Sequence, residues 1–427
     1  MRAPARLVLA YVLMQVVIAG GGLAALRTVE ELRAVGFDGP VTMLAAEGRP
    51  PYDRPPLSKA ALSLSPEALA GEPDAAAIEA ELDTALAADF PALGVDLHLS
   101  EPVTGLDVAA ARVRTDAGEY PYDRLVVATG AAPIVLPGPG RQRFLRTHED
   151  AVELRDRLRP GLRLAVVGAG WIGAELATAA AARGCQVTVV EAGPAPLAAA
   201  IGAEVGARTE PWYEAAGVEL RTSVLVESVE DGGLTLRGGD WIPADEVVTA
   251  VGVRPAVGWL AGSGLELENG VAVDPGLRTS VPGVFATGDC ASFWSLRYGR
   301  RLRFEHWDIA MRAPTVVAAN LAGGDEIYDP VPYSWSEQFG HMMQYAGYHA
   351  TADRLIWRGP PPPTSDPGTT AEPWTVCWLA GDRLVALLAV DRPRDLSQGR
   401  RIIAAGTPVD PDRLADPAVQ LKNATAS

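Results

Sequence analysis

The chain has 427 residues, which at about 150 residues per domain suggests two to four domains. Hydrophobic residues make up 48% and charged residues 21%, a globular composition that excludes a largely disordered chain. The net charge of -16 would repel phosphate backbones over most of the surface, which argues against general nucleic-acid binding.

The three cysteines are too widely spaced to form a recognisable redox or metal motif. Cys185, Cys290 and Cys377 lie about ninety residues or more apart, so no CxxC pair, zinc knuckle or disulfide framework is indicated. We therefore expect a protein of the reducing cytoplasm.

An apolar run at residues 7–20 follows Arg2 and Arg6 and superficially resembles a signal peptide. We do not interpret it as one, because it continues directly into a glycine turn, and cleavage near Ala19 would remove the strand that this turn requires. Met14 is a candidate for the true start. At roughly fourteen residues the run is also shorter than the twenty or so needed to span a bilayer.

Residues 15–47 have the pattern of a strand, a glycine turn, a helix and a second strand. The first strand, residues 15–19, is apolar and β-branched, as in a buried parallel strand. The turn has the form GxGxx(G/A), given by Gly20, Gly22 and Ala25. Apolar residues then recur at helical spacing, namely Leu26, Val29, Leu32 and Val35. The second strand ends at Glu47. Such a turn admits a pyrophosphate and the acid binds ribose hydroxyls, so this segment predicts a dinucleotide site.

A second copy of this pattern occupies residues 163–191, with glycines at Gly168, Gly170 and Gly173. Its acid, Glu191, follows Gly168 by 23 residues, close to the offset of about twenty in dinucleotide-binding folds. An acid at this position favours the free 2′-hydroxyl of NAD, and residues 192–197 contain no base that would bind the 2′-phosphate of NADP. We therefore expect NADH to be preferred over NADPH.

Two dinucleotide units in one chain indicate that two nucleotides meet, and a flavin with a nicotinamide is the pairing that allows internal hydride transfer. Two further strands support this interpretation. One, in residues 123–133, ends in Ala128, Thr129 and Gly130; the other, in residues 281–291, ends in Gly288 and Asp289. Both are expected to end in the ligand crevice at the carboxyl ends of the strands. Asp289 is the expected partner of flavin ribityl hydroxyls, with a helix N-cap as the alternative.

With these residues in view, the chain resembles the NADH-dependent ferredoxin reductase family, the group of putidaredoxin and rubredoxin reductases, which is related to glutathione reductase. The strings that carry the resemblance are residues 20–44, PYDRPPLSK at 51–59, GAGWIGAELA at 168–177, FEHWDIAMR at 304–312 and the two strands ending in ATG and TGD. PYDRPPLSK is the most selective of these.

The resemblance implies an α/β fold like that of glutathione reductase, with two Rossmann-like dinucleotide-binding domains and a C-terminal α+β domain. The expected FAD-binding domain comprises residues 14–135 and 250–326, the NAD-binding domain residues 136–249, and the C-terminal domain residues 327–418. It also implies non-covalently bound FAD, oxidation of NADH, and single-electron delivery to a [2Fe-2S] ferredoxin that supplies a monooxygenase or dioxygenase.

Individual site residues follow from the same resemblance. Arg54 and Lys59 match flavin-contacting positions, and Glu175 matches the glutamate that pairs with the lysine beside the nicotinamide, with an exposed helix charge as the alternative. Trp171 matches an aromatic lid over the flavin, with a core residue as the alternative. Trp307 matches the residue at the flavin pyrimidine side, and Glu305 lies close to it in sequence. The remaining expected nucleotide-binding residues are Ile172 and Gly252.

The chain also departs from the family pattern. Ala132 replaces an arginine often found after the ATG strand, and residues 197–202 lack a basic residue common in the family, which suggests weaker nucleotide affinity. Residues 359–373 are rich in proline and are expected to form an inserted, extended surface loop.

After about residue 327 the pattern changes to aromatic and β-branched runs around Gly381 and Asp382, which predict a hairpin in a small antiparallel sheet. A helix from about Asp395 is expected to follow. Since the chain lacks a paired-cysteine motif, disulfide reduction at the flavin is excluded.

Two groups of arginines are candidates for docking an acidic ferredoxin, because a local patch outweighs distant like charge at physiological salt. The first comprises Arg297, Arg300, Arg301 and Arg303, and the second Arg392, Arg394, Arg400 and Arg401. The alternative is a solvated basic face without a partner.

Two other functions stay open. An NADH oxidase or peroxidase would send electrons to oxygen with a reactive cysteine after the first glycine turn, but no cysteine precedes Cys185. An NADH-responsive regulatory flavoprotein, as in relatives like apoptosis-inducing factor, would bind partners instead of reducing them. The pI of about 4.8 argues against a DNA-binding version.

Overall fold

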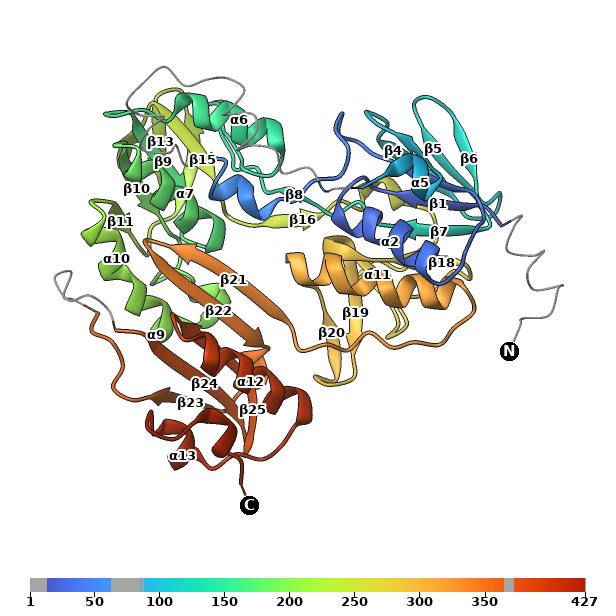
Figure 1. Ribbon diagram of the computed structural model, residues 1–427. Coiled ribbons are helices and arrows are strands. Elements are labelled where there is room, and N and C mark those ends of the chain that lie inside the picture. The colour runs from blue at the N-terminus through green and yellow to red at the C-terminus, as the bar shows by residue number, and fades with distance from the viewer. Residues whose placement is uncertain (1–13, 63–85, 87, 365–371, 427) are drawn as a thin grey trace. The chain divides into compact units, whose positions relative to one another are not determined.

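The computed structural model describes residues 14–62, 86, 88–364 and 372–426, and the chain divides into two units (Figure 1). Unit 1 comprises Met1–Asp53, Thr84–Ala132 and Arg254–Pro332, and unit 2 comprises Arg54–Asp83, Pro133–Val253 and Tyr333–Ser427. The expectations for the first thirteen residues and for the centre of the proline-rich insertion, 365–371, lie outside the described residues.

Unit 1 is built on a parallel five-stranded sheet with the order β18-β7-β1-β2-β3. Its strands are β1 (Val16–Ala19), β2 (Val41–Leu44), β3 (Val95–His98), β7 (Arg124–Val127) and β18 (Val284–Ala286). Every residue of β1 and β2 is buried, which explains their apolar runs. The helices α2 (Leu23–Ala34) and α11 (Trp307–Leu321) pack against each other (Figure 1).

The predicted first helix is confirmed, with one correction at its end. Leu26, Val29 and Leu32 are buried in α2. Val35 lies beyond the last helical turn, at the C-cap, and is 45% exposed. Val35 fits the helical spacing of the other three apolar residues, but the chain turns at Gly36 and the helix ends before Val35.

The other elements of unit 1 are short. They are α5 (Phe90–Leu93), the antiparallel sheet of β4 (Val103–Asp107), β5 (Arg112–Thr115) and β6 (Glu119–Pro121), the sheet of β17 (Val271–Val273), β19 (Ala291–Ser295) and β20 (Arg300–Leu302), and the 3-10 turns η3 (Gly258–Leu260) and η4 (Gly288–Cys290). The strands β8 (Ala131–Pro133) and β16 (Val253–Pro255) span the boundaries of the two units.

Unit 2 contains a second parallel sheet, with the order β11-β10-β9-β15. Its strands are β9 (Arg163–Val167), β10 (Gln186–Val190), β11 (Glu219–Arg221) and β15 (Glu246–Thr249). Around it lie η1 (Pro55–Ser58), α6 (His148–Arg157), α7 (Trp171–Ala182), α8 (Ala198–Ile201), α9 (Ala203–Gly206), η2 (Ala207–Thr209), α10 (Glu210–Ala215) and a three-stranded sheet of β12 (Val226–Glu230), β13 (Gly233–Leu236) and β14 (Trp241–Pro243).

The last part of unit 2 is an antiparallel sheet with the order β21-β22-β25-β24-β23 (orange to red in Figure 1). Its elements are β21 (Tyr333–Gln338), β22 (His341–Gly347), η5 (His349–Thr351), β23 (Arg354–Arg358), β24 (Trp374–Ala380), β25 (Arg383–Val390), α12 (Pro393–Ala405), α13 (Pro411–Ala415) and η6 (Leu421–Asn423). The predicted hairpin at Gly381 and Asp382 and the predicted helix after it are confirmed.

The predicted fold class is confirmed: two parallel-sheet dinucleotide-binding folds are combined with an antiparallel C-terminal sheet. Within the described ranges, no helix is long and apolar enough to cross a bilayer.

A buried ion network fixes the start of β15, and its removal is expected to destabilise the protein. Arg143, with a side chain only 5% exposed, pairs with Glu246 and with Glu153, and Glu246 also accepts from Arg157 at 2.7 Å. Glu246→Gln leaves the buried guanidinium undercompensated, so we expect it to lower the free energy of unfolding by about 2–3 kcal/mol. Urea unfolding at neutral pH measures this change.

Asp245→Asn is the matched control, because Asp245 is the neighbouring residue but pairs with Arg163 at an exposed position. We expect little change from it. Equal loss of stability in the two variants would show that burial of the Arg143 network is irrelevant.

Candidate functional site

In unit 1 the glycine turn packs against the residues that follow β7 and β2. At Gly22 it faces open space. Gly20 has φ +134, and a Cβ there would lie 2.1 Å from the carbonyl oxygen of Ala128. A Cβ at Gly21 would lie 2.2 Å from that of Ala45. Gly22 is the N-cap of α2, has no capping side chain, and a Cβ there would meet no protein atom within 4 Å. The turn therefore leaves backbone N–H groups and free space at a helix N-terminus, as a phosphate requires.

The ends of β7 and β18 lie at the same edge of the sheet, because all of its strands are parallel. After β7, the Thr129 hydroxyl donates to the carbonyl oxygen of Ala256 at 2.8 Å, and Gly130 has φ +68. After β18, the Thr287 hydroxyl is fully buried and has no hydrogen-bond partner among the described residues. Gly288 approaches the first turn of α2, where a Cβ would lie 3.0 Å from that of Ala24.

This edge fits the FAD that the sequence predicts. The buried hydroxyl of Thr287 needs a hydrogen-bond partner, which a bound polar ligand supplies. Asp289 is half-buried and lies within η4, whose N-cap is Thr287, so the alternative reading of Asp289 as an N-cap is wrong. Asp289 follows β18 by three residues, at the carboxyl end of this strand.

Glu47 follows the sheet edge three residues after β2, later than the predicted strand end. Its carboxylate accepts a hydrogen bond from the Tyr52 hydroxyl at 2.5 Å. The indole nitrogen of Trp307 donates to Asp53 at 2.9 Å, and Glu305 pairs with Arg303. Tyr52 and Asp53 were missed by sequence reasoning, although both lie in the PYDRPPLSK string.

The glycine turn of unit 2 repeats this geometry. Gly168 has φ +103, and a Cβ there would lie 2.5 Å from the carbonyl oxygen of Ala250. A Cβ at Gly173 would lie 2.0 Å from the carbonyl oxygen of Gly168, so only glycine permits α7 to pack this closely. Gly170 corresponds to Gly22: it is the N-cap of α7, and a Cβ there would meet nothing within 4 Å. This glycine turn has the backbone geometry and the free space that the predicted pyridine nucleotide requires.

Glu191 lies directly after β10 and is fixed by backbone donors. Its two carboxylate oxygens accept from the N–H groups of Ala169 and Gly193, each at 2.7 Å. Burial and the charge of Glu191 raise the pKa of the nearby Tyr213 hydroxyl. The carboxylate is thus held in place beside the glycine turn, where it can accept a ribose hydroxyl.

The remaining predicted residues of this part lie in different environments. Ile172 is exposed, and Gly252 has φ +104. Trp171 is partly buried and packs against the apolar cluster that includes Ile201 and Trp212. Arg54 donates to the carbonyl oxygen of Arg146.

Glu175 of α7 is the centre of a buried polar cluster, with only 3% of its side chain exposed. The alternative reading of Glu175 as an exposed helix charge is therefore wrong. One carboxylate oxygen, Oε2, accepts from Lys59 Nζ at 2.8 Å and from the Ser58 hydroxyl. The other, Oε1, accepts from the Ser336 hydroxyl at 2.6 Å and from the Glu337 backbone N–H at 3.3 Å. Four donors thus hold the Glu175 carboxylate in one position.

The cluster is assembled from three parts of unit 2. Ser58 is the last residue of η1 and Lys59 is its C-cap, Glu175 lies on α7 and Ser336 on β21. Gln338, two residues further along β21, donates to the Ser336 hydroxyl at 3.0 Å. Sequence reasoning missed the two serines and this glutamine. Ser336 and Gln338 are two residues apart on β21 and so share a face of the strand, and both are buried, whereas Glu337 between them is exposed.

The three thiols are poor nucleophiles. Burial raises the pKa of Cys290 to about 11 and that of Cys377 to about 12. Burial also raises the pKa of Cys185. All three therefore stay protonated at neutral pH, and the thiolate needed for disulfide or peroxidase chemistry is absent from these positions.

Fold and site together define a two-nucleotide oxidoreductase with a C-terminal antiparallel domain. Comparison with known families agrees: residues 14–313 match the pyridine nucleotide-disulphide oxidoreductase family, and residues 333–425 match the reductase C-terminal domain. The chain belongs to the pyridine nucleotide-disulphide oxidoreductase family.

Curated relatives and solved structures match over nearly the full chain. The ferredoxin–NAD(+) reductase component of the anthranilate 1,2-dioxygenase system of Burkholderia cepacia is 38% identical over 95% of this chain and 98% of its own. The crystal structure of Fdr9 is 48% identical, with a TM-score of 0.87 over 96% of this chain and 99% of that chain. The putidaredoxin reductase in its covalent complex with putidaredoxin is 32% identical, with a TM-score of 0.85 over 96% of this chain and 97% of that chain.

The predicted resemblance is confirmed by these matches. The protein is an oxidoreductase, and the predicted cofactors, FAD and NAD(H), are those of its family.

Proposed function

We propose that this protein is an NADH:ferredoxin oxidoreductase of the cytoplasm, which supplies electrons to a [2Fe-2S] ferredoxin serving an oxygenase. The observation that carries the proposal is the similarity of the chain to a reductase component of a dioxygenase system. This similarity extends over the nucleotide-binding region and the C-terminal domain. The positions of the three cysteines support it further, because no two of them form the closely spaced pair that a disulfide reductase needs.

Bound FAD would supply the redox chemistry that links a hydride donor, NADH, to a one-electron acceptor, the ferredoxin. The protein contributes binding, orientation and charge. We assign the pyrophosphate of FAD to the turn at Gly20 and Gly22, its ribityl chain to Asp289, and its adenosine ribose to Glu47. The turn at Gly168 and Gly170 takes the pyrophosphate of NADH.

Glu175 and Lys59 act together in this proposal. The ionised carboxylate orients the ammonium group of Lys59, whose positive charge stabilises the negative charge that develops on flavin reduction. Ser58 and Ser336 hold the carboxylate, so that Lys59 keeps one position throughout the reaction.

We propose the arginine group on and beside β20 as the docking surface for the acidic ferredoxin. Arg301 donates to the carbonyl oxygens of Val273 and Ser292, and Arg303 pairs with Glu305. These two residues are thus engaged within unit 1. Arg297 and Arg300 are exposed, so we propose them as contact residues for the acidic groups of the partner.

Steady-state oxidation of NADH and of NADPH by the purified yellow protein, with and without a [2Fe-2S] ferredoxin, tests the proposal. Cytochrome c reduction reports the electron outlet. We expect turnover that requires ferredoxin and prefers NADH. Turnover that is independent of ferredoxin would favour oxygen as the acceptor, and slow reduction with a long-lived charge-transfer complex would favour a regulatory flavoprotein.

Glu191→Gln should relax the coenzyme preference. The amide oxygen still accepts from one backbone N–H, but the negative charge that repels the 2′-phosphate is lost. We expect the ratio of kcat/KM for NADH over NADPH to fall by about tenfold. Glu191→Ala also removes the contacts with the backbone N–H groups. Comparing the two variants therefore distinguishes the effect of the lost charge from that of a less ordered loop. An unchanged ratio in both variants would mean that another residue discriminates at the ribose.

A further inference from the structure

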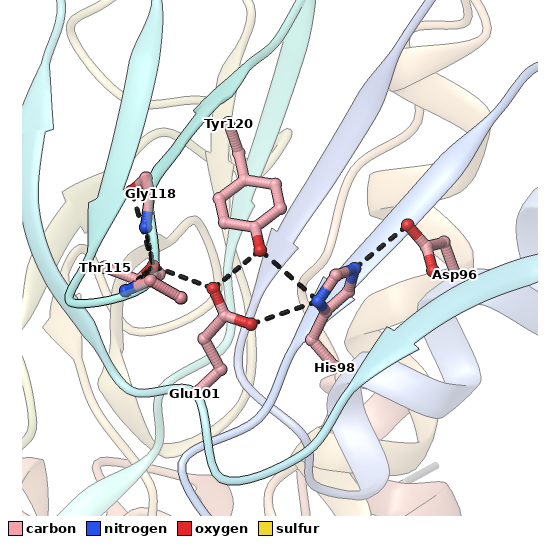
Figure 2. Close-up of polar contacts among 7 residues, drawn as sticks. Asp96, His98, Glu101, Thr115, Gly118 and Tyr120 are labelled. Carbon is pink, nitrogen blue, oxygen red and sulfur yellow. Dashed lines mark hydrogen bonds and ion pairs between the residues drawn. The ribbon is translucent and has the colours of Figure 1, made fainter.

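Unit 1 contains a cluster of titratable side chains outside the candidate site, at the end of β3 (Figure 2). His98 Nδ1 lies 3.0 Å from Glu101 Oε2, and His98 Nε2 lies 2.9 Å from Asp96 Oδ2. The hydroxyls of Tyr120 and Thr115 donate to Glu101 Oε1 at 2.6 and 2.7 Å, and the Tyr120 oxygen lies 3.3 Å from His98 Nδ1. Five side chains from β3, β5, β6 and the turn after β3 thus form one network.

The geometry favours a protonated imidazole. Each ring nitrogen of His98 faces a carboxylate oxygen, and a neutral ring has one N–H, so only the protonated ring donates to both. Asp96 is 72% exposed and its hold on the ring is weakened by water. Glu101 is only 13% exposed and is better shielded from water.

The charge states of the cluster agree with this geometry. Hydrogen bonding to Asp96 raises the pKa of His98, with Glu101 adding to it against the opposing effect of burial. Burial opposes ionisation of Glu101, but the hydrogen bonds from Tyr120, Thr115 and His98 lower its pKa overall. Burial and the charge of Glu101 raise the pKa of Tyr120 to about 12. Within the described residues, Asp96, Glu101 and Tyr120 are the titratable groups facing the ring.

The turn that this cluster closes is bonded to the segment bearing Glu47. Ala45 N–H donates to the carbonyl oxygen of His98 at 2.8 Å, and Glu101 N–H donates to that of Ala45 at 2.7 Å. Ser100 N–H donates to the carbonyl oxygen of Glu47 at 3.0 Å. Ser100 has φ +56, a left-handed conformation unfavourable for serine, so the surrounding contacts must hold it.

The same segment touches the glycine turn. A Cβ on Gly21 would lie 2.2 Å from that of Ala45, so Ala45 packs directly against the glycine turn. A continuous path of contacts therefore runs from His98 and Glu101 through Ala45 and Glu47 to the edge assigned to FAD.

We propose that His98 and Glu101 are positioning residues for cofactor binding, and that the protonated His98 ring slows the release of FAD by holding the turn at 98–101 against Ala45 and Glu47. The inference rests on the proposed function in its assignment of unit 1 to FAD. A metal site is a weaker reading of the cluster, because the described residues include no group of three or more His, Cys, Asp or Glu placed to hold a metal ion.

The sign of the pH dependence follows from the protonation of His98. Its pKa in the folded protein is raised above the ordinary 6.5, so its contribution is complete below that value and is lost as pH rises through the raised pKa. Glu101, with a lowered pKa, loses its charge only in acid, below its ordinary 4.5. FAD should therefore be held best in the mildly acidic range, while Tyr120 stays protonated throughout the range tested.

FAD release from the holoprotein on dilution, followed by the rise in flavin fluorescence, tests this at about pH 6 and about pH 9. We expect release to be on the order of fivefold faster at the higher pH, a coupling at the low end of those between linked sites. His98→Gln should release FAD at the faster rate at both pH values. Glu101→Gln should also release FAD at the faster rate at both pH values. This second variant tests the inference if His98→Gln does not fold.

His341→Gln is the matched control. The His341 ring also faces a carboxylate, that of Asp391 at 2.9 Å, but it lies on β22 of unit 2. This variant should keep the wild-type pH dependence. Equal release rates of the wild type at both pH values, or a pH dependence retained in His98→Gln or lost in His341→Gln, would overturn the inference. A purified chain that binds no FAD would instead contradict the proposed function, and the inference with it.

Discussion

Replacing Glu175 with glutamine will slow the reduction of bound flavin by NADH by about a hundredfold, the loss typical of removing a fixed electrostatic group. The carboxylate accepts from four donors, two on each oxygen. An amide presents NH₂ to one of these pairs, so either Lys59 or Ser336 loses its acceptor and the charge that orients Lys59 disappears. Stopped-flow mixing with NADH under anaerobic conditions measures the rate constant, and saturation gives the dissociation constant of NADH, which should change little.

Two serines of β21 make the test specific. Ser336→Ala removes one of the four donors, and we expect a three- to tenfold slower reduction, about the worth of one hydrogen bond to a charged group. Ser334→Ala is the control, because Ser334 lies on the same face of the strand, and of these two serines it is Ser336 that bonds to Glu175. If Glu175→Gln reduces its flavin at the wild-type rate, the carboxylate has no role in hydride transfer. If Ser336→Ala and Ser334→Ala reduce their flavin equally slowly, the slower rate results from a disturbed β21 and not from the loss of the Ser336 hydroxyl.

Alanine at Gly22 will abolish tight FAD binding, and alanine at Gly170 will leave FAD in place but weaken NADH binding by about a hundredfold. At both positions the new methyl group meets no protein atom within 4 Å, so we expect the fold to be unchanged. It fills the space that a pyrophosphate needs against a helix N-terminus. FAD content after gel filtration and NADH titration of the reduced-flavin signal measure the two effects separately.

Gly258→Ala provides the control for the glycine exchange. A Cβ at Gly258 also meets nothing within 4 Å, but this glycine lies in η3, away from both glycine turns in sequence. It should bind both nucleotides normally. Loss of FAD from the Gly170 variant, or full FAD binding by the Gly22 variant, would contradict the assignment of the two turns.

The parts of the fold that local sequence determines were predictable. Both glycine turns, their flanking strands and the acids Glu47 and Glu191 lie within βαβ segments of about thirty residues, where spacing alone constrains the geometry. The hairpin around Gly381 was predictable for the same reason. Val35 shows the limit of periodicity: its spacing fits the helix, but the helix ends one residue before it.

The polar partners of the site were not predictable, because they come from distant parts of the chain. Ser336 is 161 residues from Glu175, and Trp307 is 254 residues from its partner Asp53. Tertiary packing, which no local pattern encodes, brings these pairs together. Glu175 itself was identified through a resemblance, since a glutamate in a helix is otherwise expected to face solvent.

The transfer of electrons from NADH to a [2Fe-2S] ferredoxin is the central claim, and one anaerobic experiment tests it directly. The protein is reduced with one equivalent of NADH and mixed with an excess of oxidised [2Fe-2S] ferredoxin, and the flavin and iron-sulfur absorbance are followed together. The account predicts that the flavin is reoxidised and that two ferredoxin molecules are reduced for each NADH, on the order of ten times per second or faster. Flavin that stays reduced while ferredoxin stays oxidised would contradict it.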